Sequence, residues 1–305
     1  MTFLLEEGEE GLQQRRGVPP WYILYRSFIV LGVGSVTILS VFFAFVGAGW
    51  PGAPDDCIED DSSDCFCESF NVTDVLTNAA GVRQPANTFS NFYAFATSGF
   101  VAFVVYKDRL IQHQSSNLMR GSHSWVADLY VFCVLHLGLG SMFFHGSLTQ
   151  WGGFVDVNSM YWFTSFLSTY TLRRMWNNAP VFYVLFFTLV TIFTAMKLVA
   201  DAVVSIAILV VLYFLAEVAI GIRTKTLLQG TRFAIAMWLC AIVCILFALF
   251  FWAASSTGGF LCVPESAMQA HGLWHVLAGC TATFLFLFWR AEGHGEDKHQ
   301  SEGKK

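Results

Sequence analysis

Eight apolar stretches, each long enough to cross a lipid bilayer, constrain this chain more than any other feature. A transmembrane helix needs about 20 mostly apolar residues, because the hydrocarbon core is about 30 Å thick. The candidate spans are residues 27–48, 88–106, 124–146, 153–172, 180–197, 201–222, 233–254 and 270–289. Backbone polar groups in lipid must be satisfied inside the protein. The chain is therefore predicted to fold as an all-α polytopic membrane helix bundle.

The composition agrees with this fold and excludes other classes of protein. Hydrophobic residues make up 55% of the chain and charged residues 13%, whereas a soluble domain carries about 25% charged residues. The net charge of −5 adds little to this, because in a membrane protein the positions of the charges matter more than their sum. A disordered protein, a nucleic-acid binder and an ordinary soluble enzyme are thus excluded.

The basic residues predict how the bundle lies in the membrane. Lys and Arg concentrate in the cytosolic loops of membrane proteins. With the N-terminus in the cytosol, all 17 of them fall on the cytosolic side except Arg83 and Lys197. We therefore predict eight spans with both termini in the cytosol. Residues 1–26 are then a cytosolic N-terminal segment, and residues 290–305 are a cytosolic tail.

Residues 49–87 form an acidic, cysteine-containing loop on the luminal side in this topology. Cys57, Cys65 and Cys67 lie in this loop, and Cys262 lies in the last outer loop. Four cysteines on the oxidising side allow up to two disulfides, in any of three pairings. Asn71 begins a glycosylation sequon on the same side. The other four cysteines fall within spans and are predicted to be packing residues: Cys133, Cys240, Cys244 and Cys280.

Polar residues inside the spans mark the candidate site, because ionisable groups in the bilayer are costly and are usually functional. Ser141 and His145 lie near the end of the third span, and Asp156 lies near the start of the fourth. His271 and His275 open the last span. Residues four apart share one face of a helix, so two histidines at this spacing can bind the same metal ion.

The predicted topology places these five side chains at one depth. The third span runs outward, whereas the fourth and the eighth run inward, so all five lie near the outer ends. Three imidazoles with an open fourth position are typical of a catalytic zinc site. A lone histidine in a span is more often a packing residue. His136 is interpreted as one, because it lies about half a turn around the helix from His145.

The segments that carry these residues resemble the alkaline ceramidases. Residues 138–148, Gly-Leu-Gly-Ser-Met-Phe-Phe-His-Gly-Ser-Leu, together with Asp156, are similar to the second and third helices of that family. Residues 271–279, His-Gly-Leu-Trp-His-Val-Leu-Ala-Gly, are similar to its last helix, and residues 87–91, Asn-Thr-Phe-Ser-Asn, to the start of its first. The similarity extends over roughly residues 65–289.

This resemblance implies a seven-helix catalytic domain over residues 88–289. Residues 27–48 have no counterpart in the seven-helix pattern and are predicted to form an extra N-terminal transmembrane helix. The expected location is the membrane of the endoplasmic reticulum or the Golgi.

The implied activity is zinc-dependent hydrolysis of the amide bond of ceramide, a membrane lipid substrate, to sphingosine and a fatty acid. By resemblance, His145, His271 and His275 hold the zinc ion. Asp156 orients the attacking water and accepts its proton, and Ser141 stabilises the oxyanion of the tetrahedral intermediate.

The resemblance also implies a calcium site near the outer face and a disulfide between Cys67 and Cys262. Glu68 matches one acidic calcium ligand of the family. Gln84 stands where the family has a Glu, and its side chain offers calcium a carbonyl oxygen but no charge.

Two other functions compete with the enzyme. A non-enzymatic lipid or hormone receptor of the same superfamily would carry the same three histidines. A metal transporter would need polar residues at several depths along a path, whereas here they cluster at one level. The spacings from Ser141 to His145 and from His145 to Asp156 favour the enzyme.

Overall fold

A computed structural model describes residues 21–58, 66–111, 117–120, 125–176, 179–199, 201–224 and 232–291. Several predictions lie partly outside this range. They concern residues 1–20 of the N-terminal segment, residues 292–305 of the tail, and residues 59–65 of the acidic loop, which include Cys65 and four of the acidic residues.

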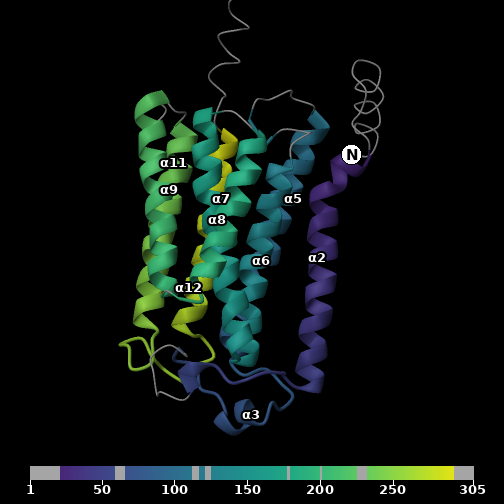
Figure 1. The fold of residues 1–305 in the computed structure, drawn as a ribbon, viewed down its shortest axis with the longest axis vertical. Coiled ribbons are helices and arrows are strands. Elements are labelled where there is room, and N and C mark those ends of the chain that lie inside the picture. Colours follow the sequence, from purple (N-terminus) through teal and green to yellow (C-terminus); the bar gives the residue numbers. More distant parts are fainter. Residues whose placement is uncertain are drawn as a thin grey trace, which may run out of the picture.

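Long helices run side by side and form a bundle (Figure 1). They are α2 (Trp21–Ala48), α5 (Tyr93–Ile111), α6 (Val126–Ser147), α7 (Gln150–Trp176), α8 (Ala179–Met196), α9 (Ala202–Thr224), α11 (Arg232–Ala254) and α12 (Ala270–Ala291). The short helices η1 (Asp56–Ile58), α3 (Val72–Leu76) and α4 (Pro85–Ser90) belong to the segment between α2 and α5. The prediction of an all-α polytopic membrane bundle is confirmed.

Most of the long helices are suited to lipid by length and composition. In the described part of the chain, six helices qualify as membrane spans, and α8 is a shorter apolar helix. Large apolar side chains point away from the bundle: Val36, Leu215 and Leu246 are 68%, 63% and 60% exposed. Such extensive apolar surface is stable in a bilayer rather than in water. The chain is therefore an integral membrane protein.

Helix α7 is long enough to span the membrane, with 27 residues, but it is more polar than its neighbours. Several of its hydroxyl side chains are satisfied within the helix. Thr164, Ser168 and Thr169 each donate a hydrogen bond to a carbonyl oxygen one turn earlier. A helix with this composition is accommodated at the centre of the bundle, where it packs against α6, α8 and α9.

Two helix boundaries differ from those predicted. Helix α2 begins at Trp21 rather than at residue 27, so Arg26 is a buried helical residue. The predicted helix over 88–106 is divided in two, because α4 ends at Ser90 and α5 begins at Tyr93. Pro85 starts α4, since proline lacks the N–H group that the first helical position leaves unpaired.

A buried ionic cluster joins α2 to the rest of the bundle. Asp128 of α6 accepts hydrogen bonds from Arg26 Nε at 2.6 Å, from Ser27 Oγ at 2.6 Å and from an Arg109 guanidinium nitrogen at 2.7 Å. Arg109 and Asp128 are almost fully buried. A charge in such surroundings is stable only when it is paired. The N-terminal helix is thus held in place by the carboxylate of α6.

Glycines on α6 allow neighbouring helices to approach the part of the helix that carries the site. A Cβ atom at Gly138 would lie 2.4 Å from the Ala94 Cβ of α5, and one at Gly140 would lie 2.8 Å from the Ser159 Cβ of α7. Such close approach through small residues is common between membrane helices. Ser141 and His145 are consequently held between α4, α5 and α7.

Replacement of Asp128 with Ala should destabilise the protein by about 3–5 kcal/mol, because two buried guanidinium groups would lose their counter-ion. The thermal unfolding midpoint in mild detergent measures this loss. Asp56→Ala is the matched control, because Asp56 is exposed and follows the C-terminal end of α2, whereas the cluster lies near its start. Equal midpoints for the two variants would contradict a stabilising role for the cluster.

Candidate metal centre

His145, His271 and His275 come together where α6 ends and α12 begins. All three side chains are buried, and their candidate ligand nitrogens lie within 4.8 Å of one another. Nε2 of His271 is 3.2 Å from Nε2 of His145. Among the described residues, these three histidines are the group of side chains that could hold a metal ion. The structure therefore brings together the three histidines that the sequence singles out.

The donor set fits a small transition-metal ion. Two histidine nitrogens bound to a tetrahedral zinc at about 2.0–2.1 Å are separated by about 3.3 Å. The distance of 3.2 Å between the Nε2 atoms of His145 and His271 matches that spacing. Imidazole ligands suit zinc and related ions. The three histidines would thus leave a fourth position for water or substrate.

Hydrogen bonds orient two of the three imidazole rings from outside the centre. His145 Nδ1 lies 2.7 Å from the side-chain oxygen of Gln84. His275 Nδ1 lies 2.7 Å from Ser90 Oγ. Both contacts leave the Nε2 atoms directed toward the centre. Ser90 lies at the end of α4, so the break between α4 and α5 places this hydroxyl against α12.

Ser141 lies beside this group. Its hydroxyl oxygen is 3.2 Å from His275 Nε2, and it accepts a hydrogen bond from Asn91 Nδ2 at 3.2 Å. Because Asn91 donates to Ser141, the hydroxyl hydrogen of Ser141 is available to another acceptor. Ser141 is therefore placed to donate a hydrogen bond to a group bound next to the histidines.

Asp156 is buried, and its Oδ1 atom has no hydrogen-bond partner among the described residues. A buried carboxylate oxygen without a partner is costly, unless a ligand or water completes its bonding. Asp156, Ser141 and His275 all line one cavity. The arrangement therefore places a proton acceptor and a hydroxyl donor around a common space beside the histidines.

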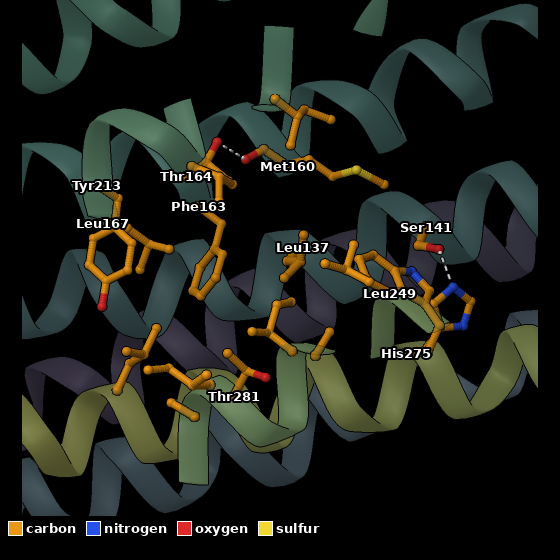
Figure 2. A pocket seen from close by; sticks show the side chains of 18 of the residues that line it. Leu137, Ser141, Met160, Phe163, Thr164, Leu167, Tyr213, Leu249, His275 and Thr281 are labelled. Atoms are coloured by element: carbon orange, nitrogen blue, oxygen red, sulfur yellow. Dashed lines mark hydrogen bonds between the residues drawn. The ribbon is translucent and has the colours of Figure 1, made fainter. Parts of the chain in front are cut away.

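That cavity has a volume of about 180 Å³ and extends from the histidine group into the bundle. Ser141 and His275 lie at one end, and Tyr213 and Leu167 lie toward the other (Figure 2). Its walls come from α6, α7, α9, α11 and α12, with mostly apolar side chains such as Ile206, Val210, Ile242 and Leu249. The space suits a hydrocarbon chain attached to a polar group.

The segment between α2 and α4 covers the histidines. The ring of Phe66 stacks on His271 with centroids 3.6 Å apart. The backbone of Phe66 has a φ of 58°, which is uncommon for a non-glycine residue and often marks a functional position. The next residue, Cys67, forms a disulfide with Cys262, as the resemblance implied. Cys133, Cys240, Cys244 and Cys280 are free, as predicted.

Glu68 and Gln84, the two predicted calcium ligands, both make protein contacts. The two carboxylate oxygens of Glu68 accept hydrogen bonds from the backbone N–H groups of Ala86 and Asn87, each at 2.7 Å. Burial raises the pKa of the Glu68 carboxyl above its ordinary value, and these two donors act in the opposite direction. We derive no role for calcium from this arrangement, and the calcium site stays a prediction. Asn71 is exposed, and its side chain caps α3.

Sequence reasoning missed the residues that support the histidines. Ser90, Asn91 and Phe66 were given no role, although each contacts a predicted site residue. Polar residues cluster at the start of the second predicted span, at the same expected depth as the histidines. This pattern could have indicated a role for Ser90 and Asn91. His136 was interpreted correctly as a packing residue, since its ring stacks on Phe132 and contacts Trp162.

The fold and the site define a polytopic membrane protein with a buried candidate metal centre beside an apolar cavity. The family model described as Ceramidase matches residues 62–305, and the chain belongs to this family. Membership implies a metal-dependent amidohydrolase with a lipid substrate. No curated protein matches the chain.

Replacement of Phe66 with Ala should weaken zinc binding by about 2- to 10-fold, because a ring contact of this kind is worth about 0.5–1.5 kcal/mol. Competition for zinc with a chelator measures the change. Phe70→Ala is the control, because Phe70 packs in the same outer cluster. If both variants bind zinc equally well, stacking on His271 does not support the site.

Proposed function

We propose that the protein hydrolyses the amide bond of ceramide to release sphingosine and a fatty acid. The observation that carries the proposal is the convergence of His145, His271 and His275 at the polar end of an apolar cavity, in a chain of the ceramidase family. We propose zinc as the ion held by these histidines. When bound, zinc would supply Lewis-acid activation of water and of the scissile carbonyl group.

The cavity supports a substrate with long hydrocarbon chains. Apolar side chains of α6, α7, α9, α11 and α12 line it, and Ser141 and His275 lie at one end (Figure 2). A lipid entering from the bilayer would lay a chain along the apolar walls. Its amide group would then lie beside Asp156, Ser141 and His275.

Asp156 and Ser141 would divide the remaining chemistry. The free carboxylate oxygen of Asp156 would accept a proton as water adds to the carbonyl carbon, and would return it to the nitrogen as the C–N bond breaks. The hydroxyl of Ser141, with its oxygen held by Asn91, would donate to the oxyanion of the tetrahedral intermediate. The products are a fatty acid and a free amine.

We further propose the topology indicated by the basic residues. Both termini lie in the cytosol, residues 88–289 form the catalytic domain, and α2 is an added anchor. The site then opens toward the lumen of the endoplasmic reticulum or the Golgi. The exposed position of Asn71 on this side is compatible with glycosylation.

Purified wild-type protein in mild detergent should release sphingosine from a panel of ceramides, whereas His275→Ala should release none and should not retain zinc. His136→Ala is the matched control, because His136 lies in the same bundle but packs against aromatic rings. An active His275→Ala variant would overturn the proposal. A folded, zinc-loaded wild-type protein without turnover would instead support the receptor.

Asp156→Asn and Ser141→Ala separate proton transfer from zinc binding. Loss of a general base should lower kcat by about 10²- to 10⁴-fold, and loss of one oxyanion donor by about 10²- to 10³-fold. Both variants should bind zinc like the wild type, because neither residue is a proposed ligand. Steady-state kinetics with zinc analysis tests this, and unchanged kcat in both would refute the assigned roles.

A further inference from the structure

We propose that Gln84 is a positioning residue for the metal centre: its neutral side chain fixes the tautomer and the orientation of His145. This inference rests on the proposed zinc site. Gln84 would not touch the metal ion or the substrate. It would act only through the imidazole of His145.

Several hydrogen bonds connect Gln84 to its surroundings. Its backbone N–H donates to the carbonyl oxygen of His145 at 3.0 Å. Its side-chain nitrogen donates to the carbonyl oxygen of Glu68 at 3.1 Å. Its side-chain oxygen lies 2.7 Å from His145 Nδ1. Gln84 is fully buried, so these contacts are shielded from solvent.

The contact with Glu68 decides which atom of the amide faces His145. A carbonyl oxygen accepts hydrogen bonds only, so the group that donates to Glu68 must be the amide nitrogen. The amide oxygen is then the atom next to His145, and Nδ1 must carry the hydrogen that it accepts. In a neutral imidazole this leaves the lone pair on Nε2, the atom directed toward the other histidines.

The backbone around Gln84 prevents the amide from turning away. Glu68 is itself held, because its carboxylate accepts hydrogen bonds from the first N–H groups of α4. Arg83 N–H donates to the carbonyl oxygen of Gly146, and Thr88 N–H donates to that of Gln84. The segment before α4 is thus attached to the end of α6 through the backbone of Arg83 and Gln84, and Gln84 is also joined to the first turn of α4.

The three histidines are oriented in different ways. Ser90 Oγ donates to the carbonyl oxygen of Asn87 at 2.7 Å, so it accepts from His275 Nδ1 and selects the same tautomer there. His271 Nδ1 has no hydrogen-bond partner among the described residues, and its ring is held by stacking on Phe66. Gln84 is therefore the acceptor that orients His145.

A neutral acceptor also has an electronic consequence. A carboxylate hydrogen-bonded to a metal-binding histidine increases the basicity of that ligand. The amide of Gln84 increases it less and adds no negative charge near the centre. Gln84→Glu, which keeps an acceptor of the same length, should accordingly bind zinc at least as tightly as the wild type. Gln84→Met, which has a similar length but no strong acceptor, should not.

The experiment compares wild type, Gln84→Met, Gln84→Glu and the control Gln150→Met, since Gln150 is an exposed glutamine at the same end of the bundle. After removal of bound metal, the zinc affinity is measured by competition with a chelator. Gln84→Met should bind zinc about 10- to 100-fold more weakly, the usual effect of losing such a partner. Gln84→Glu and Gln150→Met should retain or exceed wild-type affinity.

A structural role alone would give a different result. It would lower the unfolding midpoint of the zinc-free Gln84→Met protein and leave its zinc affinity equal to that of the wild type, which would overturn the inference. A wild type that binds no zinc would overturn it together with the proposed function. Zinc binding that depends on Gln84, without ceramide hydrolysis, would support the inference and refute the proposed function.

A second measurement does not depend on a folded variant. NMR of the zinc-free wild-type protein labelled with ¹⁵N-histidine distinguishes the two neutral tautomers, with His145→Gln used to assign the signal. Hydrogen on Nδ1 of His145 is the expected result. Hydrogen on Nε2 would overturn the inference.

Discussion

Close packing around the C-terminal half of α6 is the constraint on which the rest of the site depends. Gly138 and Gly140 let α5 and α7 approach this helix almost to backbone contact. Ser141 and His145 follow within one or two turns, so their side chains have little freedom. In lipid, where water cannot satisfy stray polar groups, each of these side chains needs a partner within the protein or its ligand. The helices supply most of these partners, and Asp156 keeps one oxygen available.

The segment between α2 and α4 contributes as much to the centre as the long helices do. Phe66 covers one histidine, Gln84 contacts a second, and Ser90, just beyond the loop, contacts the third. The disulfide from Cys67 fixes this layer to the segment that precedes α12. The candidate centre is therefore built between two layers: a membrane bundle that provides the ligands, and a covering segment that orients them.

Much of this arrangement could be predicted from the sequence, because two physical signals are strong. Long apolar stretches indicate the spans, and the alternating direction of the spans brings His145, Asp156 and His271 to one depth. The supporting contacts could not be predicted in the same way. They depend on how each helix is rotated and on the break after Ser90, which hydropathy does not show. Arg26 is a further case, because a basic residue beside a predicted span does not reveal that Asp128 pairs with it and buries it.

The distribution of the histidines along the chain has a consequence for biosynthesis. His145 and His271 are 126 residues apart and belong to the third and the last of the predicted spans. A nascent chain therefore inserts most of its helices before the ligand set is complete. The residue that closes the covering layer, Cys262, also emerges late and pairs with a cysteine made much earlier. The group of three histidines is thus complete only when the last helix is in place.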